Sequence, residues 1–243
     1  MLDAIKVENV LFIDIETIPQ YPDFNEAPEQ TKNFWEKKSS HFRDPDKSAA
    51  DVYQRAGIYS EFGRIICISA GIIIKRNDEK TLRIKSFFGD DEKQVLVEFA
   101  EMLKKYHSSN KDLQLCAHNG KEFDFPYIAR RMIINDVKIP QILDVAGKKP
   151  WEVQFLDTME LWKFGDYKNY TSLNLLTYIF NIPTPKDDID GSMVADVYWK
   201  EKNLERIVIY CEKDVLAIAQ VFLKYKGDTF IKPENIESAS TQS

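Results

Sequence analysis

Residues 10–17, Val-Leu-Phe-Ile-Asp-Ile-Glu-Thr, have the composition of a buried β-strand with two carboxylates near its end. Because side chains alternate along a strand, Asp14 and Glu16 point to the same side, about 7 Å apart along the chain. Ionised carboxylates at the edge of a core are costly unless hydrogen bonds or a cation compensate them. The pattern predicts a site for a hard divalent cation, which prefers oxygen ligands; the alternative is that the strand ends in solvent and both acids are solvated.

The composition of the chain is that of an ordinary globular protein. Its 243 residues are 44% hydrophobic and 30% charged, which is enough for one large α/β domain with a sizeable insertion. The net charge of −6 provides no global basic field, which disfavours a pure nucleic-acid-binding module. An enzyme whose acidic site is neutralised by bound metal remains compatible with this charge.

Cysteine and histidine usage disfavours a disulfide framework or a zinc site. The three cysteines are widely spaced within apolar runs, and the three histidines form no H-E-x-x-H pattern. There is no basic N-terminal segment followed by an apolar stretch, and no apolar run approaches 18 residues. We therefore expect a cytoplasmic protein with reduced thiols, no signal peptide and no membrane span.

A long polar segment, residues 19–63, follows the first strand. Four prolines interrupt it and aromatic side chains are scattered along it, with short helices predicted over 28–38 and 46–55. A connection of this length is unusual in a compact domain and is commonly functional. Because it leaves from the end of the acid-bearing strand, we expect it to lie beside the site.

The remaining chain alternates strands and helices. The order predicts an α/β fold over residues 1–232, a mixed five-stranded sheet with helices packed on it, followed by a disordered polar tail at 233–243. The predicted strands after the first are 64–75, 81–88, 113–117 and 153–158, and the predicted helices are 91–107, 125–135, 172–180, 192–200 and 204–224.

Three more polar residues stand at positions where such folds bind ligands. Asp124 lies at a strand-to-helix turn, and Asp214 follows Tyr210 by one helical turn on the flank of an apolar stripe. Taken singly, Asp124 fits a helix N-cap and Asp214 fits a half-exposed helix edge. Together with the two strand acids, they are expected to converge at the crevice of the sheet.

These residues resemble the three motifs of the DEDD exonucleases, in the subgroup that has tyrosine in the last motif. The motifs are Asp14-Ile-Glu16-Thr, then Asn119-x-x-x-Phe-Asp124, then Tyr210-x-x-x-Asp214. The run 119–128, N-G-K-E-F-D-F-P-Y-I, is similar to the proofreading exonuclease domain of family B DNA polymerases and its stand-alone relatives. The resemblance spans about residues 10–225, leaves 19–63 unmatched, and implies a ribonuclease H-like fold. Because no polymerase domain is present, it implies proofreading in trans, with a DNA polymerase or repair factor as partner.

The resemblance also implies the roles of the site residues. Two divalent cations, Mg²⁺ or Mn²⁺, would support phosphodiester hydrolysis and the release of nucleoside 5′-monophosphates. Asp14 would bridge both ions, Glu16 and Asp214 would bind the ion on the nucleophile side, and Asp124 would bind the other. Tyr210 would orient the attacking water through its hydroxyl, because its ordinary pKa is too high for a base at neutral pH.

Candidate substrate contacts are Thr17, Asn119, Phe123 and Lys186. Three of them have an ordinary structural alternative: Asn119 as a turn residue before a glycine, Phe123 as a core side chain, and Lys186 as a solvated loop lysine. The run 162–170 interleaves lysines with aromatic rings, as single-strand binding tracks do, although an ordinary surface has the same pattern.

The sequence therefore predicts a metal-dependent 3′-5′ exonuclease acting on single-stranded or frayed DNA ends. Three alternatives remain open: an exoribonuclease on the same fold, a catalytically silent nucleic-acid-binding module, and a glycosidase that uses Asp14 and Glu16 as its carboxylate pair. The last leaves Asp124 and Asp214 unexplained.

Overall fold

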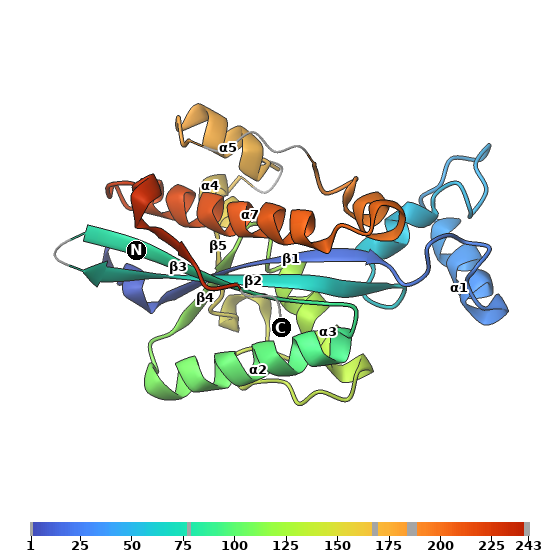
Figure 1. The fold of residues 1–243 in the computed structure, drawn as a ribbon, viewed down its shortest axis with the longest axis horizontal. Coiled ribbons are helices and arrows are strands. Elements are labelled where there is room, and N and C mark those ends of the chain that lie inside the picture. Colours follow the sequence, from blue (N-terminus) through green and yellow to red (C-terminus); the bar gives the residue numbers. More distant parts are fainter. Residues whose placement is uncertain (1, 77–78, 167–169, 184–188, 241–243) are drawn as a thin grey trace.

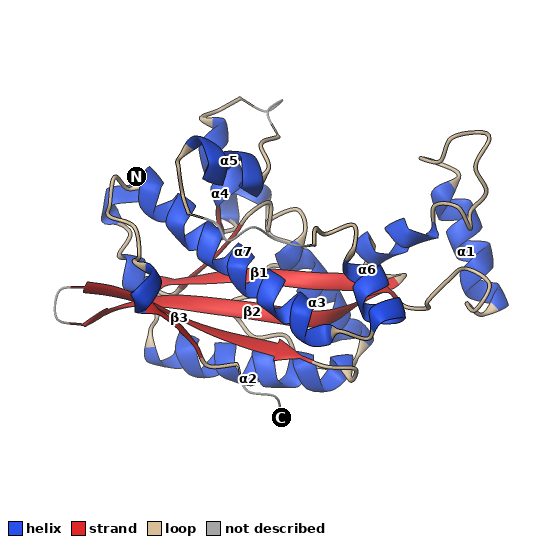
Figure 2. Cartoon of the chain, turned by 45° about the horizontal axis from the view of Figure 1, so that its top comes forward, coloured by secondary structure: helices blue, strands red, loops and turns tan. Residues whose placement is uncertain are grey.

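The computed structural model describes residues 2–76, 79–166, 170–183 and 189–240. Its centre is a mixed sheet with strand order β5-β4-β1-β2-β3-β6, of which Figure 2 shows β1, β2 and β3 side by side. The strands are β1 (Val10–Pro19), β2 (Gly63–Arg76), β3 (Glu79–Phe88), β4 (Gln114–Ala117), β5 (Leu156–Asp157) and β6 (Ile236–Ser238). The α-helices are α1 (Glu29–Ser39), α2 (Glu92–Ser109), α3 (Asp124–Ile134), α4 (Thr158–Lys163), α5 (Leu173–Ile179), α6 (Val194–Asp196) and α7 (Leu204–Tyr225).

Strand β1 lies inside the sheet, antiparallel to β2 and parallel to β4. Helix α7 covers one face of the sheet, with α4 and α5 beyond it, and α2 and α3 cover the other (Figure 1). Phe12 packs in the core on the α7 side, whereas Leu11 and Ile13 pack with Phe99 of α2 on the opposite side. The apolar residues of the strand are thus buried on both faces, and the alternation directs Asp14 and Glu16 toward α7.

A β-bulge interrupts β1 at the acidic pair. Glu16 pairs with Cys67 of β2, but Thr17 pairs with Ile65, so that one residue of β2 is left over. Such bulges bend a strand, increase its local twist and re-aim side chains next to active sites. Here the bulge lies directly after Glu16.

Residues 19–63, predicted as an insertion, pack around an aromatic core of their own beyond the end of β1 (Figure 1). Trp35 of α1 is fully buried there and makes edge-on contacts with Phe42, Tyr53 and Phe62. Its indole N–H donates to the Ala49 carbonyl at 2.9 Å, which satisfies the one polar group of the ring.

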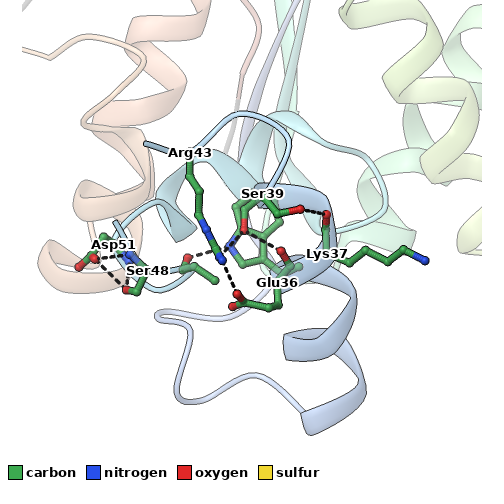
Figure 3. A network of polar contacts seen from close by, with 9 residues as sticks. Glu36, Lys37, Ser39, Arg43, Ser48 and Asp51 are labelled. Carbon is green, nitrogen blue, oxygen red and sulfur yellow. Dashed lines mark hydrogen bonds and ion pairs between the residues drawn. The ribbon is translucent and has the colours of Figure 1, made fainter. Parts of the chain in front are cut away.

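A network of polar contacts also stabilises this segment (Figure 3). Arg43 donates to Ser39 and pairs with Glu36, and Ser48 donates through its backbone N–H and its hydroxyl to Asp51. The helix predicted over 46–55 is wrong: this stretch forms turns, followed by a 3-10 helix at Tyr53–Ile58. The side chains of Ser48 and Asp51 each accept from the other's backbone N–H, as in a capping box, but the turn that they begin does not continue as an α-helix.

The predicted five-stranded sheet and disordered tail need correction, because residues 236–238 form a sixth strand parallel to β3. Ile236 packs against the core beneath α7. Glu237 forms ion pairs with Arg76 and Arg83, and the Ser238 hydroxyl donates to Glu212 at 3.0 Å. These contacts order a segment whose polar composition suggested disorder.

Two other predicted elements are shorter than expected. The strand predicted over 153–158 is reduced to Leu156–Asp157, and the helix predicted over 192–200 is a short α-helical turn followed by a π-helical segment at Val197–Glu201. Among the described residues, no helix has the length and apolarity needed to span a bilayer.

Candidate active site

The first two candidate residues, Asp14 and Glu16, lie side by side near the end of β1. Glu16 is only 7% exposed and Asp14 is half-buried. One carboxylate oxygen of each, together with Sγ of Cys211, lies within 4.8 Å of the others. The alternation of β1 therefore brings the two acids together on the α7 side, and they do not end in open solvent.

Asp124 reaches this site from the other face of the sheet. It is the first residue of α3, is 4% exposed, and accepts a hydrogen bond from the backbone N–H of Ile15. Burial raises the pKa of the Asp124 carboxyl to about 7, and the charges of Asp157 and Asp214 act in the same direction. The hydrogen bonds from its own backbone N–H and from that of Ile15 lower this pKa, but burial outweighs them.

Asp214 and Tyr210 come from α7, one helical turn apart. The Tyr210 hydroxyl donates a hydrogen bond to Asp214, and burial followed by the charge of Asp214 raises the pKa of Tyr210 above its ordinary value. The phenol therefore stays protonated at neutral pH and acts as a hydrogen-bonding group. The structure thus brings all four acids and the tyrosine to one place.

The electrostatic repulsion among these acids favours the binding of a cation. Burial, and next the negative charge of Asp214, raise the pKa of both Asp14 and Glu16 well above their usual range. Within the described part of the chain, no hydrogen bond or ion pair compensates the Glu16 carboxylate. Buried carboxylates that repel one another are suited to hard divalent cations, so this donor set fits the predicted Mg²⁺ or Mn²⁺ ions.

Cys211, which the sequence analysis treated as a core thiol, is part of the site. Its Sγ donates to the Asp14 carboxylate at 3.3 Å and lies 3.4 Å from the Asp14 carbonyl oxygen. Burial and the neighbouring Cys67 thiol raise the pKa of Cys211 well above its ordinary value. The signal for this residue was its position on the inward flank of α7, directly after Tyr210.

Asp157 is a second residue that the sequence analysis missed. It is 3% exposed and accepts backbone N–H bonds from Asn119, Lys121, Met159 and Glu160 at 3.0–3.2 Å. One carboxylate thus caps α4 and also holds the loop that leads to Asp124. An acid at the end of a predicted strand, like the pair on β1, was the available signal.

Three of the four predicted substrate contacts are described. Thr17 is hydrogen-bonded to the Tyr127 hydroxyl, and Phe123 lies partly buried against the core with its ring 5.4 Å from that of Tyr127. Asn119 adopts a left-handed backbone conformation with φ of 62°, and its side-chain oxygen is buried without a hydrogen-bond partner. Lys186 lies outside the described residues.

Thr17 and Phe123 line a pocket of about 440 Å³ that also contacts Glu16. Gln54 and Arg55 of the segment 19–63 form part of its wall, as do Gly191, Ser192 and Ala195. This segment therefore lies beside the acidic site, as its point of departure from β1 predicted.

The beginning of the run 162–170 packs against α7. Trp162 stacks on Tyr225 of α7, with ring centroids 6.1 Å apart, and Lys163 lies over the ring of Tyr170. The His118 Nε2 atom is 3.0 Å from the Thr171 carbonyl oxygen. Residues 167–169 of this predicted track lie outside the described residues.

A solved polymerase structure shares this architecture. The family B DNA polymerase from the hyperthermophilic archaeon Pyrobaculum calidifontis is 16% identical with a TM-score of 0.50, over 89% of this chain and 24% of the polymerase. The RNase domain of yeast Pop2 is 11% identical with a TM-score of 0.44, over 97% of this chain and 84% of that one. The chain thus spans about a quarter of the polymerase, and its fold is ribonuclease H-like.

A match to a family model shows which family the chain belongs to. Residues 58–234 match the model for predicted 3′-5′ exonucleases related to the exonuclease domain of PolB, and the chain belongs to this family. The matched region contains Asp124, Tyr210 and Asp214, whereas Asp14 and Glu16 precede it. A comparison with curated proteins gives no match.

Proposed function

We propose that this protein is a divalent-metal-dependent 3′-5′ exonuclease that removes nucleoside 5′-monophosphates from the 3′ ends of single-stranded or frayed DNA. The observation that carries the proposal is the convergence of Asp14, Glu16, Asp124 and Asp214 on one buried site with Tyr210 beside them. A glycosidase pair would need only the first two acids.

The four acids would hold two divalent cations, Mg²⁺ or Mn²⁺, which when bound supply a nucleophilic water and stabilise the leaving oxygen. The remaining contributions come from the chain itself. Tyr210 presents a protonated hydroxyl to Asp214, in position to orient a water molecule on that side of the site. Asp157 holds the loop before α3 through the N–H groups of Asn119 and Lys121, so that Asp124 keeps its orientation.

The pocket of about 440 Å³ beside Glu16 is the proposed seat of the terminal nucleotide. It combines an aromatic wall at Phe123 with polar groups at Thr17 and Gln54, and Arg55 adds a positive charge from the segment 19–63. Aromatic faces stack on any base, so this wall binds without strong sequence preference. We infer that the segment 19–63 guides the 3′ strand, and that a polymerase or repair factor would act with this chain in trans.

The test is a digestion assay with 5′-labelled DNA and RNA of matched sequence, offered as single strands, duplexes and duplexes with a mismatched 3′ end. Asp14→Ala and Asp214→Ala should abolish cleavage, whereas Glu101→Ala, an exposed acid on α2, should retain it. Deletion within 19–63 should change the preferred substrate length. Asp14→Ala and Asp214→Ala proteins that degrade DNA at the wild-type rate would refute the proposal, and a preference for RNA would replace DNA as the substrate.

A further inference from the structure

One atom of the acidic site has a different chemistry from the rest. The Cys211 thiol donates to Asp14 at 3.3 Å, whereas every candidate ligand that the exonuclease motifs supply is an oxygen. Carboxylate oxygens suit Mg²⁺ and Mn²⁺, but a thiolate selects softer cations such as Zn²⁺ and Cd²⁺. The site therefore contains a mixed donor set.

The geometry allows these three side chains to bind one ion. The candidate ligand atoms of Asp14, Glu16 and Cys211 all lie within 4.8 Å of one another. A point equidistant from three atoms at that limit is about 2.8 Å from each, so shifts of about 0.5–0.8 Å reach bonding distances of about 2.0–2.3 Å. Such shifts are within the range of ordinary side-chain adjustment.

Glu16 provides an independent indication of a ligand. The residue is more than nine-tenths buried and its carboxylate faces this cluster, yet among the described residues nothing donates a hydrogen bond to it. A buried carboxylate without a partner is costly, and a cation bound between Glu16 and its two neighbours would remove that cost.

We propose that Asp14, Glu16 and Cys211 together bind a thiophilic divalent cation, of the Zn²⁺ or Cd²⁺ class, at the position that a catalytic ion would otherwise occupy. When the sulfur–metal bond forms, the Cys211 S–H bond breaks and its proton passes to solvent. The inference rests on the proposed function only for its consequence, which is that such ions inhibit the exonuclease.

The test is a titration of the purified, metal-free protein with CdCl₂, followed by the thiolate-to-cadmium charge-transfer absorption in the ultraviolet. Wild type should gain one equivalent of this absorption, and excess MgCl₂ should shift the titration to higher cadmium concentration. Cys211→Ala should lose the band and bind Cd²⁺ at least tenfold more weakly. Cys116→Ala, which removes a buried thiol from the core beneath α7, is the matched control and should keep it.

The outcomes separate this inference from the proposed function. An unchanged band in Cys211→Ala, or a band lost only in Cys67→Ala, would overturn the inference even if Mg²⁺-dependent exonuclease activity is present. A band that depends on Cys211 in a protein without nuclease activity would support the cation site and count against the proposed function. If Cys211→Ala does not fold, Cys211→Ser keeps the hydrogen bond to Asp14 and replaces it in the titration.

Discussion

A buried ion pair, Glu92 with Arg131, joins the segment 19–63 to the helices beneath the sheet, and its removal has a calculable effect. Arg131 is 4% exposed and donates to Glu92 through Nε at 2.8 Å and through Nη2. Its Nη1 donates to the Ser60 carbonyl at 2.9 Å. Glu92 also accepts from the Ile65 N–H at 2.7 Å and from Asn135 at 2.9 Å.

Arg131→Met keeps the apolar stem of the side chain but removes its charge and every donor. Glu92, 7% exposed, is then left as a buried carboxylate with two of its four bonds, and the Ser60 carbonyl loses its donor. Breaking a buried pair in this way costs about 3–5 kcal/mol. For a chain of this size, the loss corresponds to a fall in Tm of about 6–20 °C.

Urea denaturation followed by circular dichroism measures this difference in the free energy of unfolding. Arg130→Met is the matched control, because Arg130 is the adjacent residue of α3 and is exposed; its substitution should change stability by no more than about 0.5 kcal/mol. If Arg131→Met costs no more than Arg130→Met, the pair makes no net contribution to stability and the reasoning is wrong.

Three further predictions concern the site. Because the pKa of Asp124 is raised to about 7 from an ordinary 3.8, the folded metal-free protein holds this proton more tightly than the unfolded chain. Its stability should therefore fall as the pH rises from about 4 to 7, and thermal melts of Asp124→Asn should show a smaller fall over that window. Tyr210→Phe should lower kcat at least about tenfold with little change in KM, since it removes a hydroxyl needed only during hydrolysis; a larger change in KM would contradict this. Chelation with EDTA should abolish cleavage, and MgCl₂ should restore it and raise the Tm of wild type but not of Asp14→Asn.

Local patterns in the sequence predicted the central part of the fold. The period of two along β1 is a property of the strand itself, so it correctly placed Asp14 and Glu16 on one side before any partner was known. The period of α7 likewise predicted its buried face and the helical turn that separates Tyr210 from Asp214. The strand β6 was missed because its order comes from Ile236 and Glu237 meeting residues more than 150 positions earlier.

The residues that complete the site were missed for a similar reason. In the sequence, Cys211 is one apolar residue in an apolar stripe, and only the approach of α7 to β1 places its thiol beside Asp14. Asp157 belongs to a strand of two residues, and its four bonds are made to loops and a helix start that no local pattern assigns to it. Roles that depend on tertiary neighbours have no periodic signature.

Gly71 explains how α7 comes close enough to complete the site. It pairs with Phe12 across the β1–β2 ladder, and a Cβ atom at this position would lie 2.6 Å from Cγ1 of Val215 and 3.2 Å from Leu82. Any side chain there would push α7 away from the sheet, and Val215 directly follows Asp214. Glycine within a strand costs about 0.5–1 kcal/mol relative to alanine. This glycine lies where α7 approaches the sheet, and the repulsion between the Asp214 and Asp14 carboxylates depends on that approach. A glycine in an apolar strand indicates a bulge or a close contact, but only the fold identifies α7 as the element that uses it.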